Sequence, residues 1–100
     1  MSVLTELSMF PMDKGESVSN YVSKVVEVLK NSDFPYKMGA MSSLIETDTI
    51  EESLSVVNKC YKALENDCNR VYVTIKMDIR KGKQNMMEGK IESLEKKLSN

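Results

Sequence analysis

The segment Arg70–Arg80 constrains the fold most, because apolar and polar residues alternate through its whole length. The apolar members share one parity: Val71, Val73, Ile75, Met77 and Ile79. The other parity carries Tyr72, Thr74, Lys76, Asp78 and Arg80. A period of two over a β-branched run predicts a long strand with one apolar and one polar face. That polar face could be bathed in solvent, bind a polar molecule or be covered by another subunit.

The size and charge of the chain exclude several classes of protein. One hundred residues, of which 41% are hydrophobic, predict a single globular domain spanning residues 1–100. A net charge of −1 gives no attraction for nucleic acid or for an anionic membrane surface. No apolar run approaches the roughly 20 residues that a membrane span needs. The N-terminus shows no signal-peptide pattern, so we expect the protein in the cytoplasm.

The chain carries no set of side chains typical of catalysis. It contains no histidine, the commonest general base and metal ligand. Cys60 and Cys68 form no C-x-x-C pair, so we expect two ordinary thiols rather than a disulfide or a zinc site. A glycine-rich phosphate loop and a nucleophile elbow are also missing. We therefore expect no enzymatic activity, no metal and no cofactor.

The first half of the chain predicts three strands and a helix. Alternation over Ser2–Phe10 predicts a first strand, which Pro11 ends because proline cannot donate to a ladder. From Ser17, a candidate N-cap, apolar residues recur at helical steps until Asn31-Ser32-Asp33. Two short strand candidates, joined by a tight connection at Gly39-Ala40, complete this half: Tyr36–Met41 and Ser42–Thr47.

The second half adds two helices around the Arg70–Arg80 strand. Asp48-Thr49-Ile50-Glu51 resembles a capping box with an acidic N-cap. The helix it opens carries an expected core stripe: Ile50, Leu54, Val57, Tyr61 and Leu64. A final helix is marked by Met87, Ile91, Leu94 and Leu98. The order predicts an α+β fold, a ferredoxin-like βαββαβ sandwich with an additional C-terminal helix, in which the two long strands are neighbours or near neighbours. One sheet face is then covered by helices and the other is bare.

Alternation also assigns side chains to the bare face. We expect Glu6 and Ser8 there from the first strand, and Thr74, Lys76 and Asp78 from the last. For Ser43 and Glu46 the assignment stays open. The apolar residues expected among these charges favour cover by a second copy of the chain. A carboxylate buried beside Lys76 must then be paired or must hold a ligand, so a structural ion pair and a bound polar or cationic molecule both remain.

Short motifs distributed over nearly the whole chain carry a family resemblance. They are Glu6-Leu7-Ser8, Pro11, Ser17-x-Ser19-x-Tyr21-Val22, Tyr36, Met41, Ile45-Glu46, Arg70-Val71, Ile75-Lys76-x-Asp78-x-Arg80 and Met87-Glu88-Gly89-Lys90. In order and spacing they resemble the small thiamine-binding protein family, single-domain relatives of the YkoF-like proteins. The hairpin departs from the family's usual Thr-Pro-Met-Gly-Thr, because this chain has Gly39-Ala40-Met41-Ser42-Ser43.

The resemblance implies a ferredoxin-like subunit that forms dimers and then tetramers. It also implies non-catalytic binding of thiamine or its hydroxymethylpyrimidine moiety. Carried over by position, the ligand site would use Ser8, Ser17, Ser19, Met41, Ser43, Glu46, Lys76 and Asp78. A carboxylate could accept from the aminopyrimidine or attract the thiazolium, and hydroxyls could match ring nitrogens.

Other functions compete with small-molecule binding. A structural or regulatory homo-oligomeric module without a ligand would use the same buried charges to fix the register of subunits. An enzyme would need Asp78, Lys76 or Glu46 as acid and base, without a histidine or a nucleophile to assist. RNA binding is disfavoured, because the expected bare face lacks an aromatic pair and an excess of basic residues.

Overall fold

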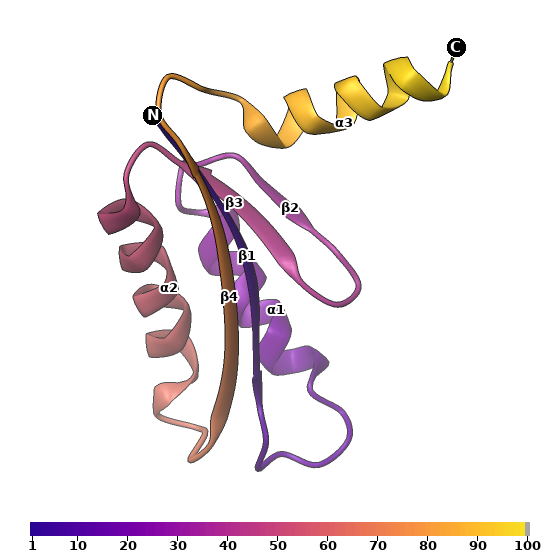
Figure 1. The fold of residues 1–100 in the computed structure, drawn as a ribbon. Helices are drawn as coiled ribbons and strands as arrows, with labels where there is room; N and C mark the ends of the chain where they lie inside the picture. Colours follow the sequence, from indigo (N-terminus) through magenta and orange to yellow (C-terminus); the bar gives the residue numbers. More distant parts are fainter. Residues whose placement is uncertain (100) are drawn as a thin grey trace.

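A computed structural model describes residues 1–99, which form four strands and three helices (Figure 1). They are β1 (Ser2–Pro11), α1 (Ser19–Lys30), β2 (Tyr36–Met38), β3 (Ser43–Thr47), α2 (Ile50–Glu65), β4 (Val71–Arg80) and α3 (Met86–Leu98). The strands form one antiparallel sheet in the order β2-β3-β1-β4, with α1 and α2 packed on one face. This confirms the predicted α+β ferredoxin-like sandwich with its additional C-terminal helix.

The two long strands, β1 and β4, lie side by side as expected. They pair from Ser2 opposite Arg80 to Pro11 opposite Val71. On its other side β1 pairs with β3 over a shorter stretch, from Val3 opposite Thr47 to Leu7 opposite Ser43. Beyond Leu7, therefore, no strand in the described part of the chain pairs with that edge of β1.

The core lies between the sheet and the α1–α2 layer. Its buried members come from both layers: Leu7, Met9, Val25, Leu29, Ile45, Val56, Cys60, Leu64 and Cys68. Among residues 1–99, no buried side-chain nitrogen or oxygen lacks a hydrogen-bond partner. Packing of the core therefore leaves no buried polar side chain of the described residues without a hydrogen bond.

The buried stripe of α2 differs from the predicted one. The helix buries Ser53, Val56, Cys60 and Leu64, whereas Leu54 is 49% exposed and Tyr61 is 37% exposed. Ser53 occupies a core position because its hydroxyl is engaged by two others. Thr5 Oγ1 donates to Ser53 Oγ at 3.1 Å, and Thr47 Oγ1 lies 2.6 Å from the same atom. A small serine with a hydrogen-bonded hydroxyl is thus buried at position 53, whereas the predicted stripe placed the neighbouring Leu54 in the core.

The starts of two helices also correct the sequence predictions. Ser17 does not cap α1, because Val18 holds the N-cap position without a side-chain hydrogen bond. The capping box of α2 lies one residue later than predicted. Thr49, not Asp48, is the N-cap: its Oγ1 accepts from the Glu52 N–H at 3.1 Å, and the Glu52 carboxylate accepts from the Thr49 N–H at 2.9 Å.

The β2–β3 hairpin turns at Gly39, so β2 ends three residues earlier than the Tyr36–Met41 prediction. The Gly39 N–H donates to the Ser42 carbonyl at 2.9 Å. A Cβ at position 39 would lie 2.6 Å from that carbonyl oxygen, closer than real Cβ contacts come. Only glycine fits this turn, which leaves residues 40–42 as a loop rather than as parts of the strands.

Both cysteines should be unreactive in the folded protein. Cys60 and Cys68 are free and buried, and burial raises the pKa of the Cys60 thiol to about 11. Because the thiolate is the reactive species, we expect Ellman's reagent to label neither residue at neutral pH until denaturant is added. Rapid labelling of the native protein would contradict the burial described here.

Candidate functional site

The register resolves which side chains occupy the bare sheet face. Leu4, Glu6, Ser8 and Phe10 of β1 lie opposite Asp78, Lys76, Thr74 and Tyr72 of β4. On β3, Glu46 lies opposite Leu4, whereas Ser43 shares the helix-covered side with the core residue Ile45. The predicted placement of Glu6, Ser8, Thr74, Lys76 and Asp78 on the bare face is thus confirmed.

Glu46 joins the bare face to α3. Its carboxylate accepts from Ser2 Oγ at 2.5 Å and from the backbone N–H groups of Met86 at 2.8 Å and Met87 at 2.9 Å. Burial alone would raise the pKa of Glu46, but these hydrogen bonds outweigh it and hold the pKa below its usual value. The carboxylate therefore neutralises the positive end of the α3 dipole and fixes the start of that helix.

Asp78 and Lys76 have different surroundings on the same face. Asp78 accepts a hydrogen bond from Lys90 of α3 and lies 3.6 Å from Arg80 Nε, and these cations lower the pKa of Asp78. Lys76 faces Glu6 across the ladder, but the Glu6 carboxylate accepts from Ser42 Oγ at 3.2 Å. Within residues 1–99, no ion pair joins Lys76 to Glu6 or Glu46.

A pocket of about 300 Å³ opens beside the end of β1, between α1 and the loop 39–42. We call it the hairpin pocket. Its lining residues are Leu7, Ser8, Met9, Phe10, Val18, Val22, Val25, Val26, Gly39, Ala40, Met41, Ser42 and Ser43. Of the eight predicted site residues it brings together Ser8, Met41 and Ser43, while exposed Ser17 and Ser19 flank the lining residue Val18. Glu46, Lys76 and Asp78 lie outside this lining.

The hairpin pocket combines apolar walls with a few hydroxyl groups. Three valines of α1 and Val18 at its N-cap form one side, and Phe10 of β1 adds an aromatic ring. The Phe10 and Tyr72 rings lie 5.9 Å apart between centroids on the bare face, so the expectation that this face lacks an aromatic pair was wrong. Met41 at the tip of the hairpin loop is 90% exposed, so its long, flexible side chain is available to cover an occupant. Apolar walls with a few polar groups are typical of sites for small ring-shaped ligands.

An open stretch of backbone borders the pocket, and the side chains alone gave no sign of it. The Met12 N–H donates to the Arg70 carbonyl at 2.7 Å, so even-numbered residues of β1 direct their backbone groups toward β4. Odd-numbered residues of β1 direct their backbone groups toward β3, but the pairing of β1 with β3 stops at Leu7. The N–H and C=O of Met9 therefore point to the side where no described strand continues. A ligand in the hairpin pocket can use them as one donor and one acceptor.

Comparison with known proteins identifies the family. The family model described as thiamine-binding protein matches residues 5–95. The chain belongs to the thiamine-binding protein family. UPF0045 protein MJ1052 of Methanocaldococcus jannaschii is 37% identical to this chain over 92 residues, which cover 92% of this chain and 91% of the relative. UPF0045 protein MT1949 of Mycobacterium tuberculosis is 35% identical over 98 residues, covering 98% and 96% of the two chains.

Solved structures share the fold of this chain. The crystal structure of MJ1052 has a TM-score of 0.84 at 36% identity and covers 93% of this chain and 95% of that one. A Thermotoga maritima protein, provisionally assigned to thiamine biosynthesis or salvage, has a TM-score of 0.80 at 16% identity, with coverage of 93% and 99%. The second likeness supports the fold alone. The family resemblance found in the motifs is confirmed.

Two further observations limit what this member of the thiamine-binding family can contain in its described residues. No helix within residues 1–99 is both long and apolar enough to cross a membrane. In the same part of the chain, no group of three or more acidic or cysteine side chains is arranged to hold a metal ion. We base the functional proposal on the hairpin pocket, because its lining includes Ser8, Met41 and Ser43.

Proposed function

We propose that the protein binds thiamine or its hydroxymethylpyrimidine moiety, without chemical conversion, in the hairpin pocket. The thiamine-binding family assignment supports the ligand class. The observation that carries the proposal is the unpaired edge of β1 at Met9, beside a pocket of suitable size. An aminopyrimidine offers an amino donor next to a ring-nitrogen acceptor, which complements one backbone C=O and one N–H.

In this binding mode the ligand would form hydrogen bonds with the backbone edge of β1, just beyond Leu7, where the pairing with β3 stops. The Met9 C=O and N–H would bind the pyrimidine edge, and the α1 valines and Met41 would cover its two faces. Ser8 and Ser43 would supply hydroxyls at the ring edge, with Ser17 and Ser19 at the mouth of the pocket. Three residues that were predicted as ligand residues have other places here: Glu46 and Asp78 contact α3, and Lys76 lies on the bare sheet face.

Titration calorimetry with thiamine and with hydroxymethylpyrimidine tests this proposal. Removing one hydroxyl contact by Ser8→Ala should weaken binding by about fivefold, which corresponds to roughly 1 kcal/mol. The matched control is Ser55→Ala on the exposed side of α2, which should leave the affinity unchanged. Absence of heat and of any thermal shift at about millimolar ligand would reject the proposal, because binding to the folded state must raise stability. The competing hypothesis, a structural or regulatory homo-oligomeric module without a ligand, would then be favoured.

We also propose that the functional unit is a homo-oligomer, a dimer of dimers, in the cytoplasm. Within residues 1–99, no strand pairs with the outer edge of β4. The apolar side chains Val73, Ile75 and Ile79 on this strand are 38–44% exposed. On α3, Leu94 and Leu98 are also exposed, because only Met86 and Met87 are buried and the rest of the helix projects from the body (Figure 1). Long, apolar edge strands favour pairing with another chain.

Light scattering after gel filtration should show a mass close to four times the 11.3 kDa of the chain. A charge on the exposed edge, introduced by Ile75→Lys, should shift the protein to smaller species because it would be buried without a partner. The control Lys37→Gln changes an exposed residue of β2, at the opposite edge of the sheet. A monomer for the unmodified chain at roughly 100 μM would contradict the oligomer, since stable interfaces bind more tightly than this.

A further inference from the structure

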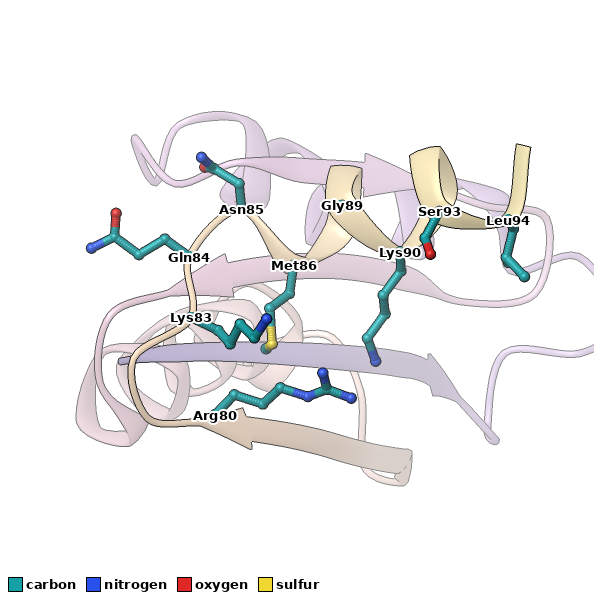
Figure 2. A pocket seen from close by; sticks show the side chains of 9 residues that line it. All are labelled: Arg80, Lys83, Gln84, Asn85, Met86, Gly89, Lys90, Ser93 and Leu94. Carbon is teal, nitrogen blue, oxygen red and sulfur yellow. The ribbon is translucent and has the colours of Figure 1, made fainter. Parts of the chain in front are cut away.

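A second hollow, of about 500 Å³, lies between the end of β4 and the underside of α3 (Figure 2). We call it the α3 pocket. It lies near the Ser2–Arg80 end of the β1–β4 ladder, whereas the hairpin pocket lies near the Phe10–Tyr72 end. The two pockets share no lining residue. An occupant of the α3 pocket would therefore share no contacting residue with a ring in the hairpin pocket.

Three cationic side chains converge on the α3 pocket. Figure 2 shows Arg80 from β4, Lys83 from the connecting segment and Lys90 from α3 extending into the same space, with Met86 between them. The amide groups of Gln84 and Asn85 point away from this space in the same view. The charged groups thus come from three separate parts of the chain but share one hollow.

These cations are only partly neutralised. Asp78 pairs with Lys90 and with Arg80, the second at 3.6 Å from Nε, but among the described residues Lys83 takes part in no ion pair. Three cations against the carboxylates of Asp78 and the nearby Glu46 leave an excess of one positive charge around the pocket. Glu46 lies nearby, but its oxygens are taken by Ser2 and by the first amides of α3. Like charges held together repel, so a dianion would stabilise this arrangement.

Gly89 supplies a second, independent observation. It lies inside α3 and lines the pocket, although glycine in a helix interior costs roughly 1 kcal/mol relative to alanine. A Cβ added at this position would meet no atom within 4 Å, so packing within the chain does not require glycine. The missing side chain leaves room on the pocket wall for an occupant.

We propose that the α3 pocket binds the phosphate group of a small phosphate monoester. The Arg80 guanidinium can bind two phosphate oxygens in a bidentate manner, and the Lys83 and Lys90 ammonium groups add charge-assisted hydrogen bonds. Met86 and Leu94 provide an apolar wall beside the cations for the ester group. The site does not use the amides at the start of α3, because Glu46 already accepts from them.

Calorimetry at low salt with phenyl phosphate and with inorganic phosphate tests this site. We expect phenyl phosphate to bind more tightly, because it also contacts the apolar wall, and both affinities to fall as salt rises. Equal affinities would keep the phosphate site and identify the free ion as its occupant. Absence of binding for both probes at about 10 mM would overturn the proposal.

The variant Lys83→Gln should weaken phenyl phosphate binding by about tenfold, since it removes one charge-assisted contact. Lys83 makes no ion pair in the described chain, so this change should leave the fold intact. The matched control Lys97→Gln alters the exposed far end of α3 and should change the affinity by less than about twofold. Equal weakening by both variants would overturn the proposal, because it would indicate nonspecific attraction.

Two further readouts separate this site from the other proposals. Thiamine affinity should be the same in Lys83→Gln and in the unmodified protein, because the pockets share no residue. Failure of thiamine binding therefore leaves the phosphate site standing, and the reverse also holds. A change in oligomeric mass for Lys83→Gln without any phosphate binding would assign the cations to a subunit contact and overturn the site.

Discussion

Leu64→Ala should lower the free energy of unfolding by about 3 kcal/mol, whereas the same substitution at Leu54 should lower it by less than about 1 kcal/mol. Both leucines lie on α2, but Leu64 is fully buried in the core and Leu54 is 49% exposed. Truncating the buried side chain removes its apolar burial and leaves a cavity beneath the sheet. Urea denaturation followed by circular dichroism, at one protein concentration for both variants, provides the measurement.

This pair of variants separates two orientations of α2. If the predicted stripe through Ile50, Leu54, Val57, Tyr61 and Leu64 were the buried one, both substitutions would cost several kcal/mol. A large effect at both positions would therefore contradict the helix orientation described here. The helix propensities of the two sites change in the same way, so local propensity cancels from the comparison.

Glu46→Ala should release α3 and lower the free energy of unfolding by roughly 2–4 kcal/mol. The substitution leaves the Ser2 hydroxyl and the Met86 and Met87 N–H groups without their acceptor. Hydrogen exchange should accelerate throughout α3, because only its first two residues are buried against the body. Glu92→Ala, an exposed acid on the same helix, is the control and should change neither quantity. Unchanged exchange in Glu46→Ala would show that other contacts hold the helix.

The same contacts make α3 sensitive to acid. The folded-state pKa of Glu46 lies below the ordinary value of 4.5, so its hydrogen bonds stabilise the fold fully above that value. Stability should then be lost as the pH falls through the lowered folded-state pKa. Hydrogen exchange in α3, measured across this range, should show the release. Glu46→Gln has no charge to titrate and should lose this contribution to the pH dependence.

The sequence predicted the fold class because two periodicities were clear. Alternation over Arg70–Arg80 indicated a long strand with two distinct faces, and the register confirmed which of its residues share the bare face. The predicted stripe of α2 was right at Leu64 but wrong at Leu54 and Tyr61, and it left out Ser53. Its burial depends on the hydroxyls of Thr5 and Thr47, which lie 48 and 6 residues away along the chain. Such long-range hydrogen bonding leaves no periodic signal.

The candidate site was harder to predict than the fold. The resemblance supplied eight residues, but only Ser8, Met41 and Ser43 line the hairpin pocket, and Glu46, Lys76 and Asp78 lie on the bare face. Glu46 has the chemistry of a ligand-binding carboxylate, yet its oxygens are engaged by the start of α3, which is 40 residues further along the chain. The open backbone at Met9 could not be found from side chains, because it depends on where a neighbouring strand stops.

The turn at Gly39 gives the hairpin loop a fixed base and an exchangeable tip. The contact with the Ser42 carbonyl excludes any side chain at position 39, whereas Ala40 and Met41 are exposed and line the hairpin pocket. A library randomised at these two positions would alter the cover of the pocket without touching the core or the turn. We therefore expect substitutions at these two positions to change the ligand preference of the proposed site.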